Sequence, residues 1–247
     1  MREGSSLREV AARMADTARN DSQRNIALWT YAGNRSCFLQ DANSLIARTP
    51  DLVEILHYLK QTFPTIERIT TYARSKTAAK KSLDELRQLK EAGISRIHIG
   101  LESGYDPVLQ FLDKGITAED HIRGGRNIVA SGISLSEYVM PGAGGKTWWR
   151  EHALETARVL NEINPDFIRL RTLTIQPRME LSASVADGSF VRADDELIAR
   201  EIRLFVENLD VTSEIVSDHI INLLPEVAGR MPDDKGKMLA VIDRFLD

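Results

Sequence analysis

Three charged residues stand near the ends of apolar segments, where their side chains could bind a ligand. Glu102 follows the apolar residues of RIHIGLESG, Arg74 ends RITTYAR, and Arg171 lies in FIRLRTL. Charges that are buried in a fold require either partners or a ligand. Two interpretations follow: the three residues line a ligand site, or they belong to an ion-pair network that joins neighbouring segments.

Five apolar segments alternate with helical patterns, and their spacing accommodates a strand, a helix and two loops in each repeat. They are Cys37–Ala42, Arg68–Arg74, Arg96–Ser103, Ser134–Met140 and Phe167–Leu173. Helix signals lie between them, because Ser82–Glu85 reads as a capping box and a glycine ends the helical pattern in both KEAGIS and VASGIS. The repeat predicts consecutive βα units, which form parallel sheets.

Alternate residues divide each predicted strand into an apolar and a polar face. In the third segment Ile97, Ile99 and Leu101 share one face, and His98 and Glu102 share the other. A parallel sheet covered by helices on both sides would be apolar on both faces, so the polar faces indicate the lumen of a barrel. Barrels assemble their sites at the carboxyl ends of the strands, which is where Glu102 lies.

Composition restricts the class of protein. The chain has 247 residues, of which 43% are hydrophobic, so it can bury one substantial core. A formal net charge of −4 gives no general attraction to nucleic acid or anionic lipid. The first residues lack the apolar segment of a signal peptide, and no apolar run is long enough to span a membrane. We therefore expect a cytoplasmic protein without a membrane partner.

Cysteine and histidine suggest no metal site. Cys37 is the single cysteine, so this chain alone offers neither a disulfide nor a cysteine-built metal centre, and we expect a small core residue there. His57, His121 and His152 lie in helical patterns without a ligand partner at suitable spacing. His98 is expected to find a hydrogen-bond partner inside the barrel. We assign no metal ligand and no catalytic residue.

Six stretches, in this order and spacing, carry a family resemblance. They are FLQDANSL (38–45), TYARSKT (71–77), HIGLESGYDPVL (98–109), DKGIT (113–117), SEYVMPGAGG (136–145) and FIRLRTL (167–173). Together they resemble the radical SAM superfamily, and most closely its branch of proteins related to elongator protein 3 and oxygen-independent coproporphyrinogen oxidase. The resemblance extends from about Leu7 to the carboxyl terminus.

The resemblance implies an α/β fold of the partial (β/α)6, TIM-like type, with S-adenosylmethionine bound across the strand ends and a [4Fe–4S] cluster that generates a radical. It also implies cofactor-binding positions. These are Asp41 and Asn43 for the methionine amino group, Glu102 and Ser103 for the ribose or carboxylate, Met140 and Gly142 for the adenine, and Arg74 and Arg171 for the methionine carboxylate or the substrate.

The cluster ligands of the family have no counterpart here. The family holds its cluster with a CxxxCxxC loop after the first strand, and this sequence contains no such loop. Residues 7–21 resemble the helix that follows the loop, so we expect a barrel that lacks its first strand, with that strand and the loop upstream of Met1. We expect residues 1–180 to form the partial barrel and residues 181–247 a C-terminal helical extension packed on it.

The sequence is therefore compatible with more than one function. Full-length relatives would cleave S-adenosylmethionine with the cluster and act on an unknown substrate, while the isolated chain is expected to be inactive. The first alternative is a non-catalytic barrel that binds S-adenosylmethionine or a partner. The second is a phosphate-loop protein, since PGAGGKT (141–147) nearly matches a nucleotide-binding loop, although Met140 replaces the first glycine.

Partners are predicted on two further observations. ARSKTAAKKS (73–82) has four basic residues and no acidic one, which leaves contact with RNA or phosphate as an unfavoured alternative to a small-molecule substrate. Loss of the first strand would leave Cys37–Asp41 with an unpaired edge. We therefore predict aggregation or a dimer through this edge.

Overall fold

The computed structural model describes residues 6–40 and 42–247, and a seven-stranded sheet forms its centre. The strands are β1 (Ser36–Leu39), β2 (Arg68–Ala73), β3 (Ile94–Glu102), β4 (Ser134–Val139), β5 (Phe167–Leu170), β6 (Glu214–Val216) and β7 (Gly229–Arg230). Their order in the sheet equals their order in the chain, with β1 to β6 parallel and β7 antiparallel. A doubly wound sheet would reverse its order, so this sheet is of the barrel type.

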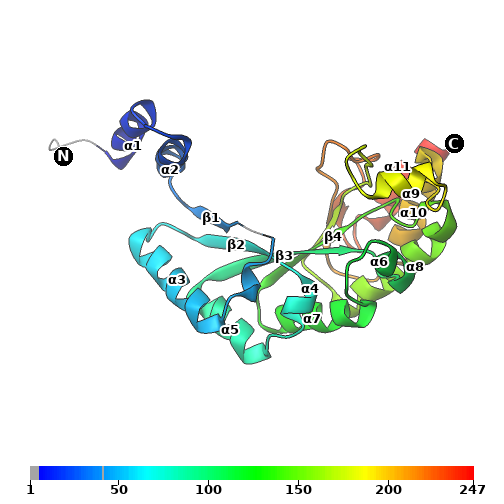
Figure 1. The fold of residues 1–247 in the computed structure, drawn as a ribbon, viewed down its shortest axis with the longest axis horizontal. Helices are drawn as coiled ribbons and strands as arrows, with labels where there is room; N and C mark the ends of the chain where they lie inside the picture. Colours follow the sequence, from blue (N-terminus) through cyan, green and yellow to red (C-terminus); the bar gives the residue numbers. More distant parts are fainter. Residues whose placement is uncertain (1–5, 41) are drawn as a thin grey trace.

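Helices precede, connect and follow the strands. They are α1 (Leu7–Asp16), α2 (Asp21–Tyr31), the 3₁₀ helix η1 (Ser44–Ile46), α3 (Thr49–Thr62), α4 (Ser75–Ala78), α5 (Leu83–Ala92), α6 (Asp106–Phe111), α7 (Ala118–Ala130), α8 (Gly145–Ile163), α9 (Leu181–Ala186), α10 (Asp195–Asn208) and α11 (Lys235–Leu246). Figure 1 shows α3, α5 and α7 along the convex side, while the concave side is open. The predicted capping box is present at the start of α5, where Ser82 and Glu85 exchange hydrogen bonds.

The two faces of the sheet differ as the alternation predicts. Ile97, Ile99 and Leu101 are fully buried in the core between β3 and the helices. Glu137 of β4 is the exception on the helix-facing side, because it is buried and neither carboxyl oxygen has a hydrogen-bond partner among the described residues. Burial, with a smaller contribution from the Glu102 charge, raises the pKa of Glu137 well above its usual value and so favours the neutral form.

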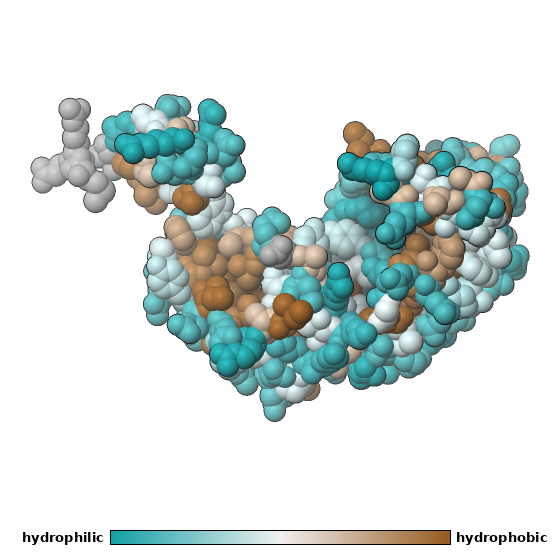
Figure 2. All heavy atoms as spheres, viewed as in Figure 1, coloured by the Kyte–Doolittle hydropathy of each residue, from teal (hydrophilic) through white to brown (hydrophobic). Residues whose placement is uncertain are grey.

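The α1–α2 hairpin stands beyond the β1 end of the sheet, and a hollow separates it from the C-terminal helices (Figure 2). It is held by Trp29, whose indole nitrogen donates to the Ser36 carbonyl at 2.6 Å and whose ring meets Phe63 edge-on at 4.9 Å. Cys37 is half-buried against the core, as expected. Because β1 pairs only with β2 in the described sheet, dimer formation through its other edge stays a prediction.

The C-terminal segment contains α9, α10 and α11, and it also contributes two strands of the sheet that the sequence analysis missed. β6 pairs with β5 in parallel and β7 pairs with β6. Strands of three and two residues are too short to show a two-residue alternation, which explains the omission. Within the described part of the chain, none of the helices combines the length and the apolarity that crossing a membrane requires.

Candidate ligand site at the carboxyl ends of the strands

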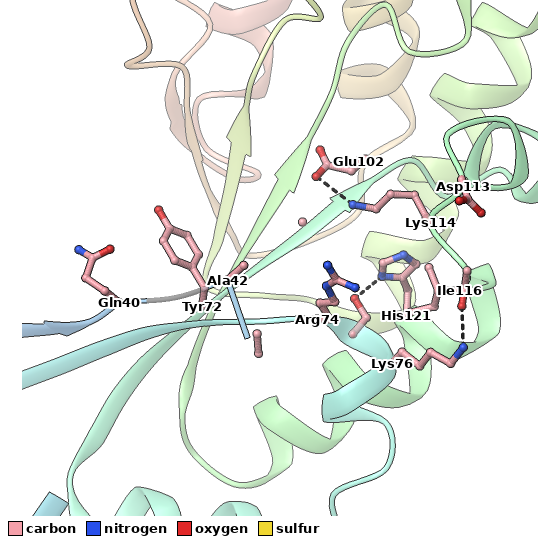
Figure 3. A pocket seen from close by; sticks show the side chains of 14 residues that line it. Gln40, Ala42, Tyr72, Arg74, Lys76, Glu102, Asp113, Lys114, Ile116 and His121 are labelled. Carbon is pink, nitrogen blue, oxygen red and sulfur yellow. Dashed lines mark hydrogen bonds and ion pairs between the residues drawn. The ribbon is translucent and has the colours of Figure 1, made fainter. Parts of the chain in front are cut away.

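A cavity of about 850 Å³ lies at the carboxyl ends of β1, β2 and β3. Its charged lining residues are Arg74, Lys76, Glu102, Asp113 and Lys114. They come from three parts of the chain, namely the end of β2 with α4, the end of β3, and the loop between α6 and α7 (Figure 3). The structure thus brings Arg74 and Glu102 together, as the sequence analysis expected of a ligand site.

Glu102 is held in a conformation that is rare for its residue type. Its φ of 62° lies in the left-handed region, and the pairing of β3 with β4 shifts register between Gly100 and Glu102. Such a backbone costs about 1–3 kcal/mol and persists only where its surroundings enforce it. The Glu102 carboxylate folds back over Gly100, where a Cβ atom would lie 2.4 Å from Oε1. Gly100 is therefore required for this orientation.

Glu102 pairs with a lysine and not with an arginine. Lys114 places its Nζ 3.3 Å from Glu102 Oε1, and both side chains line the cavity. Arg171 instead contacts Asp218 at 3.2 Å and lies over the Tyr138 ring at 5.0 Å from its centroid. The ion-pair interpretation is therefore correct only in part, since each group is paired but the two are not paired with each other.

Arg74 ends β2 with its main chain tied to the preceding loop. Its N–H donates to Asn43 Oδ1 at 3.0 Å, and Asn43 Nδ2 donates to Thr77 Oγ1 at 3.0 Å. Asn43, expected to contact a cofactor, thus joins two strand-end loops through both ends of its amide. The Arg74 side chain lines the cavity. Asp41, the other residue assigned to this loop, lies outside the described residues.

His121 of α7 also lines the cavity, which the sequence analysis did not predict. It is buried, and its Nδ1 lies 2.6 Å from Ser75 Oγ. Its Nε2 has no hydrogen-bond partner among the described residues. Burial, together with the nearby Lys114 charge, lowers the pKa of His121 to about 3, so the ring is neutral. A periodicity argument places His121 on a helix but cannot show that the helix faces a cavity.

Four rings from four neighbouring strands form a row along the concave face. Phe38, Tyr72, His98 and Tyr138 have successive centroid separations of 4.8, 5.7 and 5.7 Å. His98 Nδ1 finds no partner among the described residues, which contradicts the expectation of a hydrogen-bonded histidine. Burial lowers the pKa of His98 to about 4, with further lowering from nearby arginines that include Arg169. The row is therefore uncharged and suited to stacking.

The other assigned positions meet in a buried polar network under the ends of β3 and β4. Ser103 is fully buried, and its hydroxyl lies 2.8 Å from His152 Nδ1. His152 Nε2 lies 3.1 Å from the Met140 carbonyl, and the Gly142 N–H donates to Glu201 at 2.8 Å. Ser103, Met140 and Gly142 are thus brought together. Ser103 contacts a histidine and offers no free hydroxyl to the cavity.

His152 and Glu201 were missed by the sequence analysis, although each left a signal. Glu201 interrupts the apolar stripe that Ile198, Ile202 and Phe205 form on α10, and a lone carboxylate on such a stripe is unusual. His152 lies one helical turn before Thr156 on α8, so the two polar groups share a face. Neither signal identifies the partner, because the partners are distant in sequence.

The loop that resembles a phosphate-binding loop uses its main-chain donors internally. The N–H of Ala143 donates to the Met140 carbonyl, that of Gly145 to Gly142, and that of Lys146 to Val191. The Lys146 side chain lies 3.1 Å from Asp194. A phosphate cradle needs such N–H groups to point together at the ligand. The arrangement therefore offers no cradle at these donors.

The chain does not fit an iron–sulfur cluster. Three thiolates hold such a cluster in the family pattern, and the sequence contains Cys37 alone. Among residues 6–40 and 42–247, no three histidine, cysteine or acidic side chains lie close enough to share a metal ion. The cavity instead offers charged and hydrogen-bonding groups of the kind that bind an organic ligand.

Comparison with known proteins gives one matching family, and its description is Radical SAM superfamily; the match covers residues 9–157. A curated relative, the tRNA uridine(34) acetyltransferase of Methanocaldococcus jannaschii, is 31% identical over 85 residues, which cover 34% of this chain and 15% of that enzyme.

Two solved structures share the fold. The archaeal Methanocaldococcus infernus Elp3 with an N-terminal deletion has a TM-score of 0.60 and 15% identity, covering 80% of this chain and 53% of that chain. Escherichia coli coproporphyrinogen III oxidase (HemN), a radical SAM enzyme, has a TM-score of 0.56 and 15% identity, covering 82% and 47%. The chain thus spans about half of each structure. The likeness confirms the partial (β/α)6 barrel.

Proposed function

Because the chain belongs to the radical SAM superfamily, we propose that the cavity beside Glu102 and Arg74 binds S-adenosylmethionine. The conformation of Glu102 carries this proposal, since a strained backbone and a glycine beneath the carboxylate present that group to the cavity. A carboxylate accepts hydrogen bonds from ribose hydroxyls, and a guanidinium pairs with a carboxylate such as that of methionine. The cavity thus supplies both complementary groups.

The proposal for this chain is binding and not radical generation. In the family, the [4Fe–4S] cluster supplies the chemistry that cleaves S-adenosylmethionine, and three thiolates must hold it. Cys37 is the single thiol of the sequence and lies on β1 against the core. Residues of the chain therefore do not fit the cluster, and we derive no reaction step from it.

The test is calorimetric titration of the folded chain with S-adenosylmethionine. Glu102→Gln removes the negative charge but keeps the shape, and loss of a charge-assisted hydrogen bond should weaken binding by about 10- to 100-fold. Glu196→Gln is a matched control, because Glu196 also pairs with a cation, Arg200 at 2.7 Å, on the surface of α10. The control should bind as the unmodified chain does.

Two outcomes would contradict this proposal. Absence of binding to the folded, unmodified chain at millimolar S-adenosylmethionine would exclude the site. If Glu102→Gln instead lowers the free energy of unfolding while affinity is unchanged, then the Glu102–Lys114 pair serves stability and not a ligand.

An RNA substrate is the second candidate, because the curated relative above is named for tRNA and three cations line the cavity. Arg74, Lys76 and Lys114 could contact phosphates, whereas the net charge of −4 opposes general binding. Filter binding of tRNA at several salt concentrations tests this candidate. A triple alanine variant of these cations should lose affinity and reduce the salt dependence, and unchanged binding would exclude the cavity as the RNA site.

A further inference from the structure

We propose that His152 of α8 and Glu201 of α10 are positioning residues that fix the backbone at the ends of β3 and β4, and that His152 thereby shapes the ligand site. The inference rests on the proposed function for the identity of the ligand. The two side chains are buried, and they come from helices that follow the strands they hold. Their contacts to Met140 and Gly142 are made to main-chain atoms, so they act on the path of the chain itself.

The protonation of His152 follows from its two neighbours. The Met140 carbonyl can only accept, so the proton of the neutral ring is on Nε2, which lies 3.1 Å from that oxygen. Nδ1 therefore accepts from the Ser103 hydroxyl at 2.8 Å. The Ser103 oxygen in turn accepts from the N–H of Tyr105 at 3.0 Å. Each donor in this series of hydrogen bonds faces an acceptor, so the His152 ring links Ser103 to Met140 in one fixed orientation.

The bridge closes a ring around Glu102. The Met140 N–H donates to the Glu102 carbonyl at 3.0 Å, and Ser103 follows Glu102 directly. Hydrogen bonds and one peptide bond therefore join Glu102, Met140, His152 and Ser103 in a closed ring. A left-handed glutamate persists only when its surroundings determine it. His152 contacts Ser103, which follows this strained position, and Met140, whose N–H donates to the Glu102 carbonyl, and so holds Glu102 in place.

Glu201 performs the same task for the next turn. Gly142 has a φ of 89°, and its N–H donates to Glu201 Oε1. Gly142 also lines a second hollow of about 190 Å³ at the carboxyl end of β5, together with Leu173. Loss of the acceptor would free a buried N–H and let this turn move. Glu201 thus shapes the second hollow while His152 shapes the first.

The surroundings of Glu201 keep it neutral. His152, whose Nε2 lies 3.4 Å from Glu201 Oε1, is a titratable neighbour, and the other side chains around the pair include Ser103, Thr156 and apolar groups at the end of β4 and on α8 and α10. Glu201 Oε2 has no partner among the described residues. Glutamine offers the same acceptor with a neutral amide, so Glu201→Gln is the conservative variant and Glu201→Leu the disruptive one.

Amide hydrogen exchange and S-adenosylmethionine titration together test the inference. Glu201→Leu should accelerate exchange at Gly142, while Glu201→Gln should keep the exchange rate there within about twofold of that in the unmodified chain. His152→Phe should accelerate exchange at Tyr105 and weaken binding at least tenfold. Leu160→Ala is the control, because Leu160 is buried on α8 away from these contacts; it should lower stability without changing affinity.

The outcomes separate the two proposals. Unchanged exchange at Gly142 in Glu201→Leu, or at Tyr105 in His152→Phe, overturns the positioning role whether or not the ligand binds. Accelerated exchange with unchanged affinity in His152→Phe overturns the link between His152 and the ligand site. If the unmodified chain binds no S-adenosylmethionine, the proposed function fails, and a site shaped for this ligand fails with it, while the exchange rates still decide whether the two residues fix the backbone.

Discussion

Glu102 and Ser103 are adjacent in the chain but belong to two different polar regions. Glu102 faces the cavity, where its partner Lys114 and the nearby Arg74 and Lys76 carry charges in contact with solvent. Ser103 faces the interior, where His152 and Glu201 form a network without a paired charge. Successive residues along a strand point to opposite faces, so Glu102 at the end of β3 and Ser103 after it meet different surroundings.

The difference follows from the cost of removing charge from water. Around Ser103, burial raises the pKa of Glu201 to about 8 and lowers that of His152 to about 4, so both are neutral near pH 7. Around Glu102 the rim of the cavity is open to solvent, and Lys114 supplies the opposite charge at 3.3 Å. At the rim, Glu102 can therefore exchange its charged partner for a ligand. The buried network can only hold a fixed geometry.

The largest expected effect comes from closing the space between the two regions. A Cβ atom at Gly104 would lie 2.3 Å from the Glu155 carbonyl oxygen of α8, so Gly104→Ala must push α8 away from the end of β3. We expect a loss of about 3 kcal/mol in the free energy of unfolding, measured by urea denaturation.

Gly236→Ala is the matched control for this substitution. Gly236 lies in α11 with open space around it, and alanine should stabilise the helix by about 0.5–1 kcal/mol. If Gly104→Ala is as stable as the unmodified chain, then α8 is not tightly packed against the end of β3.

The second prediction concerns pH. The pKa of Glu201 is about 8 in the folded state against 4.5 for a free side chain, so its contribution to stability is complete below pH 4.5 and is lost as pH rises to 8. Between pH 6.5 and 8 the free energy of unfolding of the unmodified chain should fall by about 2 kcal/mol more than that of Glu201→Gln.

Two other buried groups act on this profile and serve as its internal check. Glu137 has a raised pKa and should leave a residual decline of the same sign in Glu201→Gln. His152 has a pKa of about 4 against 6.5, so its contribution is present above pH 6.5 and is lost as pH falls toward 4. If the free energies of unfolding of the unmodified chain and of Glu201→Gln change in parallel from pH 6.5 to 8, then Glu201 is ionised in the folded protein.

The third prediction separates the two neighbours directly. Ser103→Ala removes the donor to His152 and the acceptor for Tyr105, which should cost about 1.5 kcal/mol of stability, measured by thermal and urea unfolding. Ser131→Ala is a useful comparison, because Ser131 is also buried but bonds only within the turn that ends α7. If both variants lose the same free energy of unfolding, then the network contributes no more to stability than hydrogen bonds within a turn do.

The smallest effect is expected at the rim. Lys114→Met removes the partner of Glu102 but keeps the length of the side chain, and pairs of this exposure contribute less than about 1 kcal/mol. Unfolding should therefore change little, while the affinity for S-adenosylmethionine should change measurably because a ligand no longer competes with Lys114. A large loss of stability would place the Glu102–Lys114 pair with the buried network.

Much of the site could be predicted from local patterns. Alternation along β3 placed Ile97, Ile99 and Leu101 against the helices and Glu102 on the concave side, and the structure confirms both. The same reasoning could not find Lys114, which reaches Glu102 from a loop. It also assumed a hydrogen bond for His98, although alternation says on which face a ring lies and nothing about its partners.

The sequence by itself determined the alternation of strands and helices, the polar lining of the barrel and the lack of cluster ligands, because these depend on residue type and near-neighbour spacing. Only the tertiary structure decided that His152 meets Ser103 across 49 residues and that Glu201 meets Gly142 across 59. It also decided that β6 extends the sheet. Contacts at such separations arise from how whole helices pack on the sheet, and no local periodicity records that packing.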